Sequence, residues 1–151
     1  MGTKVTVSVN KTFDVNADVD RVFDLLANVP ESASHYPNVD KLNDKGDGVY
    51  EWVMEEIGVA NFSHQVIYSS KYVSDRAAGT IEWTPAGGNS DISGNWKLSD
   101  NGSGTTCVFT VNADLDIPVP RLLKGMAKPM VEQQFNGQID EYIGNLKTTL
   151  A

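Results

Sequence analysis

Residues 118–151 read PVPRLLKGMAKPMVEQQFNGQIDEYIGNLKTTLA, and this stretch decides the fold. Pro120 suits a first helical turn, where a missing N–H group costs nothing. About thirty residues at roughly 1.5 Å each give a helix of roughly 45 Å, longer than a small domain is wide. The apolar residues that recur at helical spacing are Leu122, Met126, Met130, Phe135, Ile139, Tyr142, Leu146 and Leu150. The stretch therefore predicts one long C-terminal helix.

The apolar residues of this helix fall on two different sides of a helical wheel. The side changes near Pro129, which removes the helical hydrogen bond to the Gly125 carbonyl. We expect a kink or break at residues 125–129, or else a bent helix packed along its whole length. The C-terminal half is expected to pack permanently on a sheet. The N-terminal half, with Met126 and Met130, is expected to cover something adaptable.

The rest of the chain predicts strands and two short helices. Apolar and polar residues alternate over residues 3–15, which indicates a strand with one buried face. Short helices are expected from Asp18 to just before Pro30 and, opened by Pro30, over residues 30–34. Alternating aromatic residues between turn clusters then predict an antiparallel meander of about six strands. The expected fold is α+β, with a curved antiparallel sheet of about seven strands wrapped around one long C-terminal helix and a hollow between them.

Composition narrows the classes of partner and compartment. The 12 basic and 20 acidic residues give a net charge of -8, which disfavours nucleic acid and a broadly basic membrane-binding surface. Cys107 cannot form an internal disulfide, and the chain shows no zinc-ligand spacing, so we expect no metal and no cofactor. We also expect one domain over residues 1–151 in a reducing cytoplasm, because the chain has neither a signal-peptide pattern nor a membrane-spanning run.

Four segments carry a resemblance to a known family. They are FDVNADVDRVFDLLANVPESASHYPNV (13–39), GDGVYEWV (46–53), GNWKLSDNGSGTTCVFTV (94–111) and IPVPRLLKGMAKPMVEQQF (117–135). With the order of predicted elements, they make essentially the whole chain resemble the START-like (SRPBCC) superfamily of helix-grip proteins. The nearest likeness is to the polyketide cyclase/dehydrase and lipid-transport branch, and to proteins of the carbon-monoxide-dehydrogenase G type. This resemblance implies a hydrophobic cavity that holds lipids, polyketides, hormones or other apolar molecules, and a minority of members are enzymes.

Aromatic and apolar residues on the inward faces are the candidate ligand-binding residues. His64 shares a strand face with Val66 and Tyr68, where its imidazole could bond a ligand carbonyl or act as an acid or base; the alternative is a satisfied core histidine. His35, beside Tyr36, is either a cavity-rim residue or an exposed loop residue. The full candidate set is Trp52, Met54, Phe62, His64, Val66, Tyr68, Trp83, Trp96, Phe109, Leu122, Met126 and Met130.

Three functions remain open, and no convincing catalytic pair is visible. The first is noncatalytic binding or transport of a hydrophobic small molecule or lipid. The second is a polyketide cyclase/dehydratase-like enzyme in which His64 and a tyrosine such as Tyr68 guide proton transfer. The third is an accessory protein that recruits an enzyme to the membrane.

A basic segment supplies the evidence for membrane or partner contact. Residues 117–131 contain Arg121, Lys124 and Lys128 and no acid, so this half-helix could weakly contact anionic lipid or an acidic protein. In that case the methionines would move off the cavity about a hinge at Gly125 and Pro129. The alternative is a solvated basic face over a buried apolar one.

Overall fold

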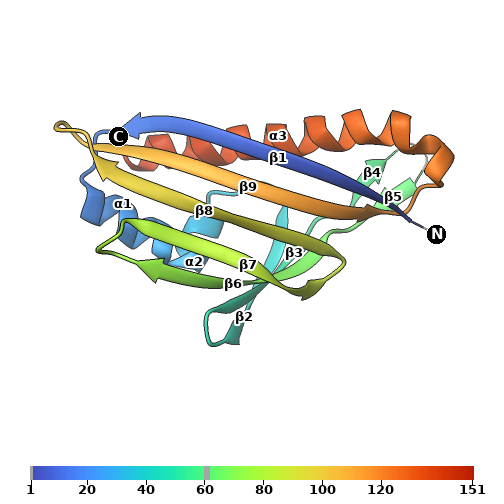
Figure 1. Cartoon of the computed structure of the whole chain (residues 1–151), viewed down its shortest axis with the longest axis horizontal. Helices are drawn as coiled ribbons and strands as arrows, with labels where there is room; N and C mark the ends of the chain where they lie inside the picture. The colour runs from blue at the N-terminus through green and yellow to red at the C-terminus, as the bar shows by residue number, and fades with distance from the viewer. Residues whose placement is uncertain (1, 60–61) are drawn as a thin grey trace.

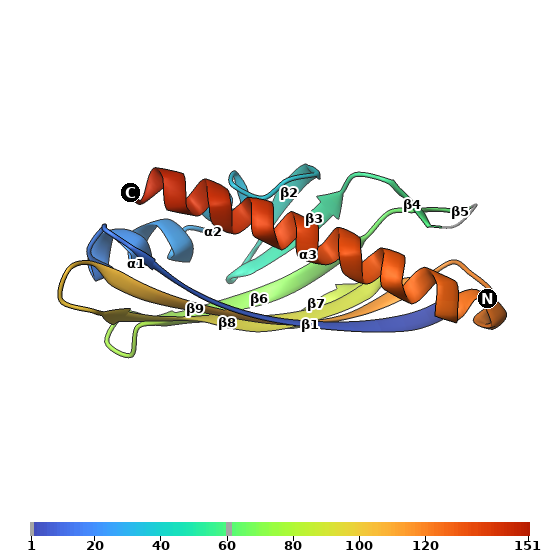
Figure 2. The ribbon, with the colours of Figure 1, turned by 90° about the horizontal axis from the view of Figure 1, so that it is seen from above.

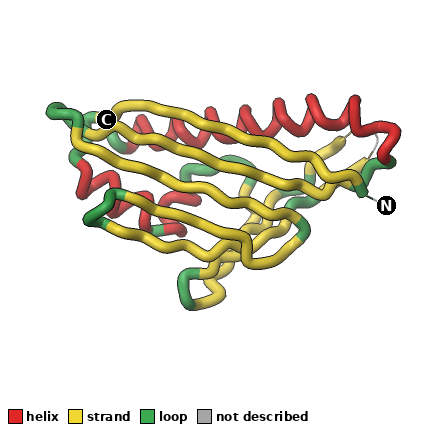
Figure 3. The backbone as a smooth tube through the Cα atoms, viewed as in Figure 1, coloured by secondary structure: helices red, strands yellow, loops and turns green. Residues whose placement is uncertain are grey.

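The computed structural model describes residues 2–59 and 62–151, with the backbone alone for residues 58, 59 and 62. One curled sheet and one long helix make up most of the molecule (Figures 1 and 3). In chain order the elements are β1 (Thr3–Val15), α1 (Val19–Ala27), α2 (Val29–Ala33), β2 (Val39–Gly46), β3 (Val49–Met54), β4 (Ile57–Val59), β5 (Phe62–His64), β6 (Ile67–Asp75), β7 (Thr80–Gly88), β8 (Ser90–Asp100), β9 (Thr105–Ile117), the short 3-10 turn η1 (Arg121–Leu123) and α3 (Lys124–Thr149).

The sheet has seven antiparallel strands in the order β1-β9-β8-β7-β6-β3-β2. The first strand pairs with the last along its whole length, from Thr3 opposite Ile117 to Val15 opposite Thr105. Buried and exposed residues alternate along β1 and β9, as a sheet with one covered face requires. Figure 2 shows α3 running along the sheet on the same side as α1 and α2. The prediction of an α+β helix-grip fold is confirmed.

Two strand assignments differ from the sequence-based expectation. A strand was not expected over β2, where apolar residues are sparse and most side chains are exposed. The single strand expected to carry His64, Val66 and Tyr68 on one face is divided, because β5 pairs with β4 in a separate two-stranded ribbon. The Asn89 side chain holds the division: it accepts from the Ile67 N–H (3.1 Å) and donates to the Gln65 carbonyl (2.8 Å).

The expected break in the C-terminal helix is wrong. The helix α3 runs continuously through Pro129, which lies early in it. Gly125, whose carbonyl loses its helical partner to the proline, is exposed, so water can occupy the free acceptor. The missing hydrogen bond therefore costs little at this position.

The C-terminal half of α3 packs into the core through Ile139, Tyr142, Ile143 and Leu146. Its end is also tied to the first helices, since the Ala17 N–H donates to the Leu150 carbonyl (3.1 Å). In the described part of the chain, no helix combines the length and hydropathy needed to cross a bilayer.

Candidate functional site

A cavity of about 110 Å³ lies between the sheet and α3. Strands β3, β4 and β6 to β9, helices α1 and α2 and the middle of α3 all contribute to its wall. The wall is mostly apolar, and Glu55 is the one charged residue among the described residues that line it. The lining residues are Leu26, Val29, Ser32, Tyr36, Trp52, Met54, Glu55, Ile57, Val66, Tyr68, Tyr72, Ile81, Trp83, Ile92, Trp96, Phe109, Val111, Leu115, Val131, Gln134, Phe135, Gln138, Ile139 and Tyr142.

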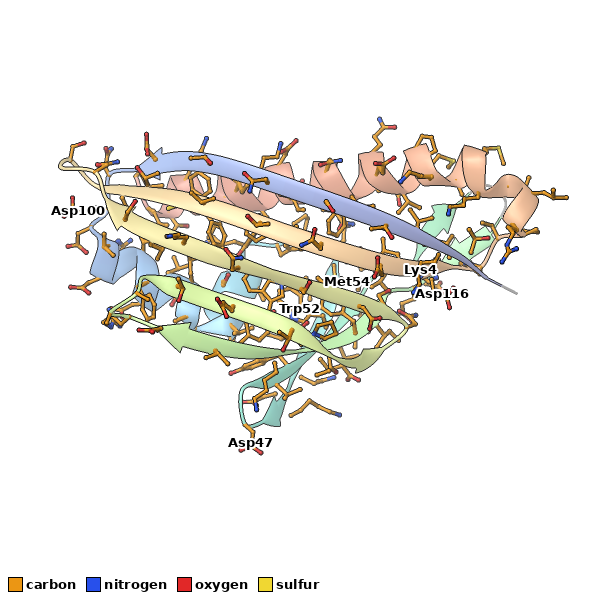
Figure 4. The ribbon with its side chains drawn as sticks, viewed as in Figure 1. Lys4, Asp47, Trp52, Met54, Asp100 and Asp116 are labelled. Carbon is orange, nitrogen blue, oxygen red and sulfur yellow. The ribbon has the colours of Figure 1, made fainter. Side chains whose placement is uncertain are left out.

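Seven of the twelve residues predicted to bind ligand line this cavity. They are Trp52, Met54, Val66, Tyr68, Trp83, Trp96 and Phe109. Trp52 and Met54 project from β3 behind the sheet in the view of Figure 4. The Trp52 ring stacks on that of Tyr68 with 5.9 Å between centroids and 6° between planes. Ligand contact by these residues stays a prediction.

Four tyrosines bring polar atoms into this apolar wall. Tyr142 shares a 2.5 Å hydrogen bond with Ser32, and the Tyr72 hydroxyl accepts from the Trp52 indole N–H at 3.0 Å. The Tyr36 hydroxyl donates to Gln138 Oε1 at 3.3 Å. These bonds fix where each phenol points, because a bonded hydroxyl has few alternative directions.

Burial raises the pKa of all four phenols, Tyr36, Tyr68, Tyr72 and Tyr142, and the pKa of Tyr142 reaches about 12. The phenols therefore stay neutral at ordinary pH. Each can donate or accept a hydrogen bond, but none can serve as a base.

One polar atom of the lining residues is buried without a partner. The Oε1 atom of Gln134 accepts no hydrogen bond from any residue that the structure describes. A buried polar atom without a partner costs roughly 1–3 kcal/mol. A bound molecule with a hydroxyl group could donate a hydrogen bond to this oxygen.

His64 does not line the cavity, which corrects the expectation that it shares an inward face with Val66 and Tyr68. The reason is that β5 belongs to the separate ribbon, where His64 pairs with Ile57. The residue is only 8% exposed, and its Nε2 has no hydrogen-bond partner among the described residues. Burial lowers its pKa, and the Asp116 carboxylate acts in the opposite direction. The side chain of Phe62 lies outside the described residues.

The expectation that Leu122, Met126 and Met130 cover the cavity is wrong. All three point outward, with 96%, 51% and 37% of their surface exposed. Ala127 and Val131 form the buried side of the same turns. The side of α3 that faces the interior is therefore not the side of the helical wheel that carries the methionines. Residues 131, 134 and 135 line the cavity in their place.

His35 also lies outside the cavity wall, so a role at its rim is not supported. Its Nδ1 is 2.9 Å from the Glu31 carbonyl and its Nε2 is 2.9 Å from the Thr149 hydroxyl. The ring therefore joins the end of α2 to the end of α3.

Sequence reasoning predicted Tyr68 but left several other polar residues of the wall out of the site, among them Ser32, Tyr72, Gln134, Gln138 and Tyr142. The spacing of residues 131, 134, 135, 138, 139 and 142 was a usable signal, since it is that of one helix side. The glutamines hid the pattern because only apolar residues were placed on the wheel.

Comparisons with known proteins identify the family and the fold. The family model for polyketide cyclase / dehydrase and lipid transport proteins matches residues 6–151. The protein TTHA0849 from Thermus thermophilus is similar in structure, with a TM-score of 0.72, 17% identity and 98% and 97% of the two chains covered. Among curated proteins, no sequence matches this chain.

Two further solved structures are similar over most of their length. The Zhui aromatase/cyclase from Streptomyces sp. R1128 gives a TM-score of 0.64 at 17% identity, with 96% of this chain and 91% of the other covered. A START superfamily protein from Mycobacterium smegmatis gives 0.66 at 13% identity, with 95% and 96% covered. Identities this low establish the shared fold alone. The likeness to proteins of the carbon-monoxide-dehydrogenase G type is not shown by these comparisons.

Proposed function

This chain belongs to the polyketide cyclase/dehydrase and lipid transport family, and from that premise we propose that it is a noncatalytic carrier or sensor that holds a hydrophobic molecule beneath α3. Residues 1–151 act as a single ligand-binding domain. The supporting observation is an apolar cavity in which the buried Gln134 Oε1 has no hydrogen-bond partner among the described residues. A ligand that buries its apolar surface there and donates a hydrogen bond to this oxygen recovers the cost of leaving it unpaired.

The wall favours a neutral ligand with a flat apolar body. The aromatic side chains offer ring faces for stacking, and the phenols offer neutral donors and acceptors. No cation lines the cavity among the described residues, and Glu55 would repel a carboxylate. The cavity volume of about 110 Å³ is below the roughly 300–1,000 Å³ of pockets for drug-sized ligands. A ligand of several fused rings therefore requires wall side chains to move.

Ligand binding can be followed directly, because all three tryptophans of the chain line the cavity. We expect native mass spectrometry of protein purified from cells to show a bound neutral molecule. Titration with a neutral polyaromatic alcohol should change tryptophan fluorescence. Absence of a bound molecule together with no fluorescence change for neutral aromatic or lipid probes would overturn the proposal.

A matched pair of variants tests the polar contact. Gln134 lines the cavity and Gln133, its neighbour on α3, is exposed. Gln134→Leu is expected to weaken binding of the alcohol probe about tenfold, whereas Gln133→Leu leaves binding unchanged. Equal effects of the two substitutions would count against a ligand contact at Gln134.

The enzyme hypothesis based on His64 and Tyr68 is disfavoured by the geometry. His64 lies outside the wall, and the raised pKa of Tyr68 prevents the phenol from acting as a base. If the protein nevertheless turns over a polyketide-like substrate, His64→Ala should leave the rate unchanged. A large loss of rate in this variant would return His64 to the site.

A further inference from the structure

The outward side of the first turns of α3 is apolar as well as the inward side. Leu122, Met126 and Met130 are spaced four residues apart, so they form one strip, which we call the outer strip. Val73 on β6 is the one other large apolar residue of comparable exposure among the described residues. Three of the four such residues thus lie together on α3.

The outer strip is not needed to hold the helix in place. Ala127 and Val131 already bury the opposite side of the same turns against the core. Leu122, in the turn η1 before α3, is 96% exposed and contacts almost nothing. An apolar group held in water at the end of an element points to contact with another surface.

The charge around the outer strip distinguishes between possible surfaces. The chain carries a net charge of -8, yet residues 117–131 contain three cations and no acid. Arg121 and Lys124 are exposed and make no ion pair with any described residue. Lys128 is directed elsewhere, since its Nζ donates to the Thr6 carbonyl at 3.3 Å.

We infer that the outer strip docks on a bilayer that contains anionic lipid. Hydrocarbon accepts Leu122, Met126 and Met130, and the headgroup phosphates accept the long side chains of Arg121 and Lys124, which can reach the interface beside the strip. A second copy of the chain fits less well, because a two-fold contact would bring the same cations together. The acidic remainder of the molecule is repelled by such a bilayer, so this face alone is presented to it.

The position of the outer strip adds a functional consequence, which rests on the proposed function. Val131 and Phe135, on the inner side of the same part of α3, line the cavity. Docking would place this part of the cavity wall beside the bilayer, from which a hydrophobic ligand could be exchanged. The docking itself requires no ligand.

Vesicle co-sedimentation of the full chain tests the inference. We expect binding to phosphatidylcholine vesicles that contain phosphatidylglycerol, and little binding to phosphatidylcholine alone or at high salt. Leu122→Ser with Met126→Ser, and Arg121→Gln with Lys124→Gln, should each lower binding about tenfold or more. Val73→Ser and Lys45→Gln are the controls, because they alter an exposed apolar and an exposed cationic residue elsewhere.

Three results would overturn the inference. They are no binding of the wild-type chain to anionic vesicles, equal losses in the control variants, and a dimer in solution that Leu122→Ser dissociates. The fluorescence titration is repeated on every variant to separate this inference from the proposed function. Ligand binding should be retained when vesicle binding is lost, since the substituted residues do not line the cavity.

Discussion

The two halves of α3 both carry apolar residues at helical spacing, but they bury them very differently. Leu146, in the C-terminal half, is fully buried, whereas Leu122, just before the helix, is 96% exposed. The C-terminal half faces the sheet and is tied at its end to the start of α1 (Figure 2). At the other end, no helix or strand that the structure describes covers the outer strip. Helical spacing therefore predicts the helix, and the neighbouring elements decide which side is covered.

The strongest test of this contrast compares two leucines. Leu146→Ala should lower the free energy of unfolding by about 3 kcal/mol, because it leaves a cavity in a close-packed region. Leu122→Ala should change it by less than about 0.5 kcal/mol, because the side chain is already in water. Urea denaturation followed by circular dichroism gives both values. Similar losses would mean that Leu122 is covered in solution.

The next effect concerns the hydrogen bond between Tyr142 and Ser32. Tyr142→Phe should lower the free energy of unfolding by about 1.5 kcal/mol, because the buried Ser32 hydroxyl loses its partner. The double variant with Ser32→Ala should recover part of the loss, since no polar atom is then left unpaired. Tyr50→Phe on β3 is the control and should have little effect. Additive losses in the double variant would show that the two hydroxyls do not stabilise each other.

Alkaline pH should destabilise the fold through the buried tyrosines of the cavity wall. Burial raises the pKa of Tyr142 from 10.0 to about 12, so the folded state favours the neutral phenol. Its contribution is complete below pH 10 and is lost as the pH rises towards 12, about 1 kcal/mol being gone by pH 11. Unfolding curves at pH 9 and 11 should therefore differ less for Tyr142→Phe than for wild type. An unchanged difference would place the ionising group elsewhere.

The smallest effect is a gain in stability from glycines of α3. Gly137 and Gly144 lie inside the helix, and a Cβ at either position would enter open space. Alanine at each should raise the free energy of unfolding by about 0.7 kcal/mol, because glycine loses more backbone entropy. Gly125→Ala, in the first turn, should gain less. A loss at Gly137 in thermal unfolding would indicate that this outward side is occupied.

The sequence predicted the fold well because buried residues recur at every second position along most of β1 and β9 and in parts of β7 and β8. It failed at β2, an exposed edge strand with two apolar residues, Val39 and Leu42, in a polar segment. It also failed at His64, because alternation gives the inward side of a strand but not the sheet to which the strand belongs. The break at residues 65 and 66 that separates β5 from β6 is held by the Asn89 side chain, through hydrogen bonds to residues 22 and 24 positions away in sequence.

The wall of the cavity was predictable where aromatic residues alternate along strands, as for Trp52, Trp83 and Trp96. It was not predictable on α3, where the wheel separated two apolar sides but could not assign one to the core. Of these two sides, the one that carries the methionines was assigned to the cavity. The small Ala127 and the branched Val131 pack there because the helix approaches β1 closely.

The pairing of β1 with β9 has a consequence for how the chain reaches its native state. Thr6 and Asp114 hydrogen-bond across that pair although they are 108 residues apart in sequence. Strand β1 therefore cannot pair until β9 has been synthesised. The entropy cost of closing the long loop between them must be overcome first. Refolding is expected to be slow. During synthesis, the N-terminal strand stays unpaired, with its apolar side chains exposed, until its partner strand is available.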